Sequence, residues 1–327
     1  MRYGGIERLV AEFVAELSKE HDIGVIGRSD SIYRRFPYGQ PIKLYPYEVR
    51  VNEDIFQQAE VHAYMEYQSI LREYDVIHDF SHQHLASRYN DHLPSLNIFW
   101  HAPSVAKYPK APYNIIALSR WAKREYERVY QQKAYYQPTI VIPTDVYKLS
   151  NKNRNDRWLS LGAITPRKGH LEAIQVCLDA GVSLDIVGKE DSAYVDYAKS
   201  VKGLCDGTQI KYLGEVDDYE KVKLYQTNKG LIYISQEPEV TSHKIQEALL
   251  CGMPAVVTNF GANPEIVTQG INGYLCSNKA GFLYAVKHVD SLKPETTNEG
   301  LREVYSIQNV VDNYIPLYQR VANGERW

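Results

Sequence analysis

Short runs of β-branched and aromatic residues alternate with helical patterns along the whole chain, and this alternation most constrains its fold. The first helical pattern places Ile6, Leu9 and Phe13 at spacings of three and four, so that one face of the segment is apolar. Such alternation is typical of parallel sheets that are covered by helices. The sequence therefore predicts an α/β protein.

The pattern divides into two halves around a polar segment, residues 148–156, that is rich in Asn and lacks apolar periodicity. Because 327 residues suit about two domains, we predict one domain over residues 1–150 and another over 151–327. An apolar stripe between residues 307 and 321 predicts a last helix that returns to the first domain. The first half is expected to form one doubly wound sheet of six strands, at residues 23–26, 42–45, 76–78, 96–100, 115–118 and 139–142. The second sheet is expected from strands 158–161, 184–187, 210–213, 231–234 and 255–258, with helices at 171–180, 195–204 and 243–251.

Charge and composition exclude several classes of protein. The 37 Lys and Arg against 40 Asp and Glu give a net charge of −3, which provides no basic field for nucleic acid. No apolar run approaches the ~20 residues of a membrane helix, and no basic stretch precedes an apolar core at the N-terminus, so we expect a cytoplasmic protein. The segment 121–130 mixes cationic and aromatic residues at helical spacing, which leaves open a weak peripheral contact at the inner face of the membrane. The four cysteines form no Cys-x-x-Cys pair.

Familiar catalytic and cofactor motifs are absent from the sequence. It has no Gly-x-Gly-x-x-Gly, Gly-x-Ser-x-Gly or Asp-x-Asp, and the histidines between residues 78 and 92 fit no metal-ligand spacing. The segment from Gly162 to Lys168 is similar to a phosphate loop, but Arg167 replaces the required Gly and Gly169 the required Ser or Thr. We therefore predict no metal and no cofactor, and expect any diphosphate to be held by cations and backbone amides.

Two junctions between a loop and a helix could hold such an anion. Gly5 opens the first predicted helix, and residues 235–243 lead into the helix that carries Glu247. The amides of Thr241, Ser242 and His243 could cradle a diphosphate. The spacing Glu239-x7-Glu247 puts two carboxylates within reach of one ligand, and each can accept hydrogen bonds from two sugar hydroxyls. By spacing alone this signal is weak, because 40 acidic residues give such pairs by chance, and the spacing then favours two solvated surface carboxylates.

A resemblance to a known family gives these segments a context. As a set, and in this order, they resemble family-four retaining glycosyltransferases of the GT-B fold, also called glycosyl transferases group 1. The resemblance covers nearly the whole chain. It is carried by the segments Tyr3–Arg8, Tyr74–His78, Leu118–Arg120, Val141–Pro143, Gly162–Gly169, Tyr212–Glu215, Glu239–Pro254, Gly261–Val267 and Gly270–Leu275.

The resemblance implies two Rossmann-like, doubly wound parallel-sheet domains that face each other across a cleft. The second would hold a nucleoside-diphosphate sugar, and the first an acceptor that is a carbohydrate, a lipid or another small molecule. The sugar would be transferred with retention and without a metal. Catalytic roles fall on His101, Lys168 and Glu239, with Glu239 at the donor hexose and His101 beside the transferred sugar. Donor-binding roles fall on Gly5, Arg167, Lys168, Thr241, Ser242, His243 and, at the ribose, Glu247.

Three departures from the family pattern stand out. Ala163 occupies the position of an Arg that usually contacts the diphosphate, a loss for which Arg167 could compensate. Thr241 and Ser242 replace a Phe-Gly pair. The strand that usually precedes the Gly-Gly loop is not expected here, because Met1 lies only three residues before Gly4. Either the start codon was assigned late, or a central strand has been lost, which would expose the edges of both neighbouring strands. A noncatalytic nucleotide-sugar-binding subunit, or an epimerase of the same architecture, is the alternative.

Overall fold

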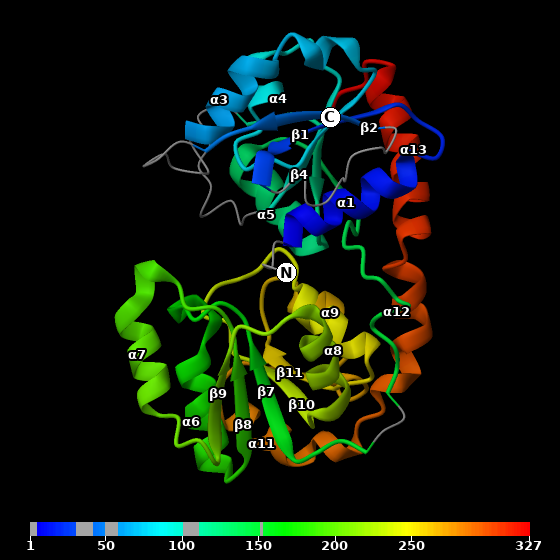
Figure 1. Cartoon of the computed structure of the whole chain (residues 1–327). Helices are drawn as coiled ribbons and strands as arrows, with labels where there is room; N and C mark the ends of the chain where they lie inside the picture. The colour runs from blue at the N-terminus through cyan, green and yellow to red at the C-terminus, as the bar shows by residue number, and fades with distance from the viewer. Residues whose placement is uncertain (1–4, 31–41, 50–57, 101–110, 151–152) are drawn as a thin grey trace. The chain divides into compact units, whose positions relative to one another are not determined.

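The computed structural model describes residues 5–30, 42–49, 58–100, 111–150 and 153–327. These residues form two compact units (Figure 1). One contains residues 142–304. The other contains residues 5–141 together with residues 305–327, so that the chain returns to it at the end. The boundary between the two units falls after residue 141, nine residues before the boundary predicted after residue 150.

The 142–304 unit is built on six parallel strands in the order β12-β11-β10-β7-β8-β9. The strands are β7 (Arg157–Leu161), β8 (Ser183–Val187), β9 (Ile210–Gly214), β10 (Gly230–Tyr233), β11 (Ala255–Thr258) and β12 (Gly273–Cys276). The α-helices are α6 (His170–Ala180), α7 (Val195–Gly203), α8 (Asp218–Thr227), α9 (His243–Leu250), α10 (Asn263–Ile266), α11 (Lys279–His288) and α12 (Asn298–Val304). Short 3-10 helices are η2 (Pro166–Lys168), η3 (Ser192–Tyr194), η4 (Val289–Ser291) and η5 (Pro294–Thr297).

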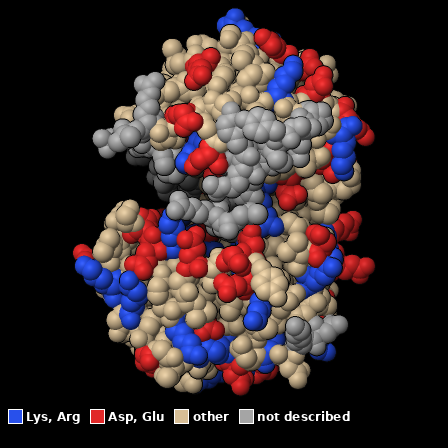
Figure 2. Space-filling view, viewed as in Figure 1, with Lys and Arg blue, Asp and Glu red and all other residues tan. Residues whose placement is uncertain are grey.

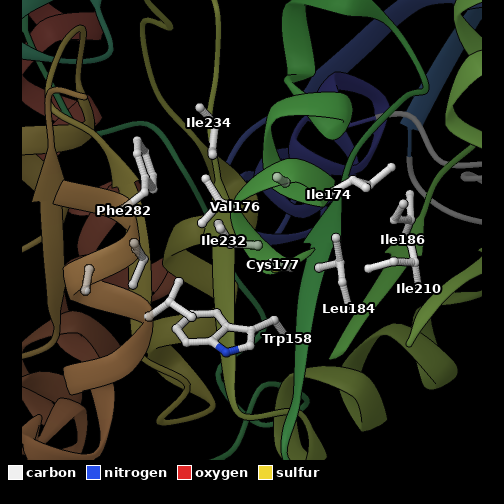
Figure 3. Packing of buried hydrophobic residues seen from close by; sticks show 14 of the residues in the cluster. Trp158, Ile174, Val176, Cys177, Leu184, Ile186, Ile210, Ile232, Ile234 and Phe282 are labelled. Atoms are coloured by element: carbon white, nitrogen blue, oxygen red, sulfur yellow. The ribbon is translucent and has the colours of Figure 1, made fainter. Parts of the chain in front are cut away.

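The main core of this unit lies between one face of the sheet and helices α6, α7 and α11 (Figure 3). Trp158 of β7 is fully buried there beside Ile232 of β10, while Cys177 of α6 and Phe282 of α11 cover them. Side chains alternate across a strand, so the neighbours of these residues along each strand face the opposite side of the sheet. On that side α8 packs against α9, and α9 packs against β11. Helices on both faces make this a doubly wound sheet.

The predicted strands of this half are confirmed to within one or two residues, and β11 matches its prediction in full. The three predicted helices are also present, as α6, α7 and α9. The sixth strand, β12, was not predicted. It has four residues and begins with Gly273, whose Cα lies so close to Ala255 of β11 that an added Cβ would be 2.1 Å from the Ala255 carbonyl oxygen. This close approach lets a short segment with weak strand propensity join the sheet.

The other unit contains two separate parallel sheets, β1-β2 and β3-β4-β5-β6. Its strands are β1 (Ile23–Arg28), β2 (Ile42–Tyr47), β3 (Ile77–Asp79), β4 (Ser95–Phe99), β5 (Ile115–Ala117) and β6 (Ala134–Tyr136). Its helices are α1 (Gly5–Leu17), α3 (Gln58–Tyr67), η1 (Ile70–Glu73), α4 (Leu85–Tyr89), α5 (Arg120–Tyr130) and α13 (Ile307–Ala322). Helix α1 packs against α13, and its apolar stripe is buried as predicted, with Leu9 and Phe13 each 2% exposed.

The prediction of a single six-stranded sheet in this half is wrong. Among the described strands, β1 pairs with β2 alone and β3 with β4 alone, so that no strand joins the two sheets. Side chains connect them instead. Phe13 of α1 packs edge-on against His78 of β3, and the hydroxyl of Tyr74 lies against Gly24 of β1, where an added Cβ would be 2.2 Å from it. β1 and β3 therefore each have one strand edge without a backbone partner among the described residues.

The predicted strand at residues 139–142 is also wrong, because the structure forms β6 at Ala134–Tyr136 and leaves 139–142 irregular. Pro138 separates the two segments and has no backbone N–H to donate to a neighbouring strand. The segment is nevertheless buried, and the hydroxyls of Thr139 and Tyr314 of α13 hydrogen-bond at 2.5 Å. Its apolar character therefore reflects burial without strand pairing.

On the face of the 142–304 unit that Figure 2 shows, the described Lys and Arg side chains are interspersed with Asp and Glu. This agrees with the near-balanced charge of the sequence. Over the described residues, no helix combines the length and apolar character needed to cross a membrane.

Candidate functional site

The order of the six strands places a candidate site at the carboxyl ends of β7 and β10. These strands are neighbours, yet the chain leaves β7 towards β8 on one side and β10 towards β11 on the other. Ligands of open α/β sheets bind at such a switch point, because the two loops that follow the strands diverge there. The loop after β7 carries Arg167 and Lys168, and the loop after β10 carries Glu239 and leads into α9.

The two loops are fixed to each other by their backbones. The Gln236 amide donates a hydrogen bond of 2.9 Å to the Arg167 carbonyl oxygen. Gly169 adopts a left-handed conformation with φ of 66° at the junction of η2 and α6. It lies so close to Ile234 that an added Cβ would be 1.8 Å from the Ile234 carbonyl oxygen. Only glycine satisfies both conditions, so Gly169 brings Lys168 to the end of β10.

Lys168 and Glu239 form an ion pair at this junction, with side chains only 14% and 10% exposed. The Lys168 ammonium also lies 3.4 Å from the hydroxyl of Tyr233, the last residue of β10. Burial by itself would raise the pKa of Glu239, but the nearby Lys244 and Lys168 ammonium groups outweigh it and lower that pKa from 4.5 to about 2. Glu239 is therefore a carboxylate at neutral pH and can only accept hydrogen bonds, as a ligand for sugar hydroxyls must.

Lys244 of α9 belongs to the same cluster and was not predicted from the sequence. It is 8% exposed, its Nζ has no hydrogen-bond partner, and it lies 3.6 Å from the centre of the Tyr233 ring. Burial and the neighbouring Lys168 hold the pKa of Lys244 well below 10.5. A lysine at a buried helical position gives no sequence signal of its own, because only the packing of α9 brings it to Lys168 and Glu239.

His170 supports the loop after β7 from beneath. It is fully buried; its Nε2 lies 3.2 Å from the Ala163 carbonyl oxygen, and its Nδ1 lies 2.9 Å from Ser160 Oγ. The Nε2–H therefore donates to Ala163, and Nδ1 accepts from Ser160. Burial, followed by the nearby Lys244, lowers the pKa of His170 to about 4, so the ring is neutral at physiological pH. His170 was also missed by sequence reasoning.

The predicted anion cradle coincides with the start of α9. Ser242 occupies the N-cap position and is 3% exposed, and its Oγ has no hydrogen-bond partner. Thr241 and His243 flank it and are partly exposed. The helix dipole makes this end of α9 electropositive. Arg167 and Lys168 enter the same region from η2, so the structure brings Arg167, Lys168, Glu239 and residues 241–243 into one part of the 142–304 unit.

Glu247 lies one helical turn further along α9 and is 4% exposed. Its Oε1 accepts from Lys221 of α8 at 3.1 Å, and its Oε2 accepts from the Tyr225 hydroxyl at 3.0 Å. Both carboxylate oxygens thus have partners within the protein. A carboxylate oxygen has two lone pairs, so these bonds leave room for a further donor. The predicted contact of Glu247 with a ribose stays a prediction.

Two predicted residues cannot be compared with this geometry. Gly5 is the first residue of α1 in the other unit. His101 lies outside the described residues. Within the described ranges, no group of three or more His, Cys, Asp and Glu side chains is arranged to hold a metal ion.

Comparison with known proteins places this geometry in a family. Residues 143–293, which include both loops and α9, match the model of the family described as glycosyl transferases group 1. These residues form a glycosyl transferases group 1 domain. The match includes Lys168, Glu239 and Glu247, the residues on which the sequence resemblance rested.

Solved structures with a similar fold cover nearly the whole chain. A glycosyltransferase from Rickettsia africae superposes with a TM-score of 0.77 at 16% identity, covering 99% of this chain and 97% of that one. Anabaena HepE in complex with UDP and glucose gives a TM-score of 0.75 at 15% identity, covering 97% and 96%. At these identities the likeness concerns the fold, and the chain has the GT-B fold of Rossmann-like α/β domains.

Two curated relatives match part of the chain. N-acetyl-alpha-D-glucosaminyl L-malate synthase of Bacillus anthracis is 25% identical over 134 residues, which are 38% of this chain and 34% of the relative. The chain thus matches about a third of the length of that enzyme.

Proposed function

We propose that this protein transfers a sugar from a nucleoside-diphosphate donor to an acceptor hydroxyl, with retention of the anomeric configuration and without a metal ion. The observation that carries the proposal is the ion pair of Lys168 and Glu239 at the switch point, beside the N-terminus of α9. The family match supports it, and so does the GT-B fold shared with HepE, which has been crystallised with UDP-glucose.

The chemistry follows from the charges at this site. When the bond between the sugar and the diphosphate breaks, negative charge develops on the leaving oxygen. Lys168 and the positive end of α9 stabilise that charge without reorganisation, since both are already in place. Glu239 remains ionised and accepts hydrogen bonds from the donor hexose. Retention rests on the family resemblance, and requires the acceptor to attack from the side that the diphosphate leaves.

The base and sugar of the donor are best identified with a panel. Purified protein would be incubated with UDP-, GDP-, ADP- and TDP-sugars, and the released nucleoside diphosphate measured by chromatography. We expect slow hydrolysis of one donor, faster release once a suitable acceptor is added, and an α-configured product from an α-configured donor by NMR. Lys168→Met should abolish release. Binding of a donor with no release under any condition would favour the noncatalytic subunit instead, and an inverted product would refute retention.

A further inference from the structure

The cluster around Glu239 contains more positive than negative charge. Lys168 and Lys244 both lie over the ring of Tyr233, at 5.8 Å and 3.6 Å from its centre, and Arg167 stands next to Lys168. The carboxylate in this cluster is Glu239, and it is bound to Lys168. The Lys244 ammonium therefore has an aromatic face beside it, but no hydrogen-bond acceptor.

A buried ammonium without an acceptor is unfavourable, because its desolvation is not offset by a hydrogen bond. The groups that face Lys244 are Lys168 and Arg167 from η2, Tyr233 from β10, Glu239 from the following loop and His170 from α6. Two of them are cations, and the neutral His170 adds no charge. The carboxylate among them, Glu239, favours the charged form of Lys244 but is already bound to Lys168. Such an arrangement is stable when an anion is bound, and is otherwise relieved by loss of a proton.

The position of Lys244 relates it to the loop after β7. A Cβ added to Gly162 would be 3.2 Å from Lys244 Nζ and 3.4 Å from Lys168 Cγ, so both lysines converge over Gly162. The next residue, Ala163, supplies no charge. The second unpartnered polar group of this region, Ser242 Oγ, lies at the N-cap of α9, two residues before Lys244. The Lys244 ammonium and the Ser242 hydroxyl thus both lie at the N-terminal end of α9, where the helix dipole is positive.

We propose that Lys244 is a second diphosphate-binding cation, supplied by α9 in place of the charge that position 163 lacks. This inference rests on the proposed function, because the diphosphate is that of the nucleotide donor. In the structure Lys244 packs on the Tyr233 ring. When the diphosphate binds, Lys168 and Lys244 contact it together, and Ser242 Oγ donates a hydrogen bond to it. Binding then restores the proton that burial disfavours in the empty site, so that diphosphate binding is coupled to proton uptake.

The test is calorimetric titration of the wild type and of Lys244→Met with UDP, GDP, ADP, TDP and inorganic pyrophosphate. Loss of a charge-assisted hydrogen bond should weaken the nucleoside diphosphate that binds by roughly ten- to a hundredfold. The corresponding nucleoside, which has no phosphate, should bind both proteins equally. Lys199→Met, on the exposed face of α7, should behave as the wild type. A melting curve confirms that each variant is folded, and Lys244→Gln replaces Lys244→Met if the latter is not.

Proton uptake is measured on the wild type by repeating the titration at pH 7, 8 and 9 in two buffers of different ionisation enthalpy. We expect uptake that is absent in the Lys244 variant. Equal affinity of wild type and variant for the nucleoside diphosphate would overturn the role of Lys244 and leave the proposed function intact. Equal weakening of nucleoside and nucleoside diphosphate would show that Lys244 acts through the fold. Failure of the wild type to bind any of these probes would refute the proposed function itself.

Discussion

Lys221 of α8 and Glu247 of α9 form a buried ion pair, with Nζ 3.1 Å from Oε1 and side chains 4% and 5% exposed. Lys221 also lies 5.4 Å from the centre of the buried Tyr147 ring, and Tyr225 donates to the other carboxylate oxygen. The pair joins two helices on one face of the sheet. A carboxylate expected to bind a ribose is therefore also a structural contact.

Removing one partner of this pair should be costly. Lys221→Met removes the cation from the buried Glu247 carboxylate, and breaking a buried ion pair in this way typically destabilises a protein by about 3–5 kcal/mol. Replacing both residues, as Lys221→Met with Glu247→Leu, should recover most of that loss, because no unpaired charge is left. Thermal unfolding followed by circular dichroism measures both. A double variant less stable than the single one would contradict this account.

Substitutions of Glu239 and Glu247 should change different kinetic constants. A hexose contact strengthens as the sugar gains positive charge in the transition state, whereas a ribose contact is the same in both states. Glu239→Gln should therefore lower kcat, and Glu247→Gln should raise the donor KM, each roughly ten- to a hundredfold. Steady-state kinetics with the donor varied would separate them, once melting curves show that both variants are folded. A reversed pattern would mean that the two carboxylates contact the opposite ends of the donor.

Gly169 should not tolerate a side chain. In Gly169→Ala, the left-handed backbone costs roughly 1–2 kcal/mol, and the added Cβ would also collide with the Ile234 carbonyl oxygen. The two loops of the site would have to separate, so we expect lower stability together with weaker donor binding. Gly181→Ala is the matched control, because Gly181 has a similar φ of 69° and nothing within 4 Å of an added Cβ. It should lose stability by the backbone cost alone and bind donor normally.

Glu60 of α3 should make stability depend on pH. Burial raises its pKa from 4.5 to about 7, although the amides of His82 and Gln83 donate to its carboxylate. The folded state therefore holds a proton that the unfolded state releases, so its contribution to stability is present below pH 4.5 and is lost as the pH rises through 7. Melting temperatures between pH 4.5 and 8 should fall less steeply for Glu60→Gln than for the wild type. Glu66→Gln, at an exposed position of the same helix, should follow the wild type.

Transfer activity should survive chelation. The proposed charge stabilisation uses Lys168 and the N-terminus of α9, so EDTA should leave the rate unchanged within about twofold, and added Mg²⁺ or Mn²⁺ should not raise it. The measurement compares the transfer rate without chelator, with EDTA, and after Mg²⁺ or Mn²⁺ is added back. Complete loss that Mg²⁺ or Mn²⁺ reverses would refute the metal-free mechanism.

Local patterns were sufficient for most elements of the 142–304 unit. Its strands are short segments rich in apolar residues and its covering helices have clear periodicity, so sequence alone located β7, β8, β10 and β11 and helices α6, α7 and α9. The same reasoning failed at residues 139–142, which are apolar because they are buried but which form no strand. Apolar patterning reports burial, and strand formation additionally needs a backbone partner.

The sequence by itself determined the α/β class and indicated the division into two parts, because these depend on local periodicity. The residues around Lys168 and Glu239 were predicted from the family resemblance that several segments carry together, since the spacing of two carboxylates alone is a weak signal. Only the tertiary structure decided that β1 and β3 belong to separate sheets, that Glu247 is bound to Lys221, and that Lys244 joins Lys168 over Tyr233. The last two features are contacts between elements that are distant in the sequence. Their chemistry depends on burial and on neighbouring charges, neither of which a residue's own type records.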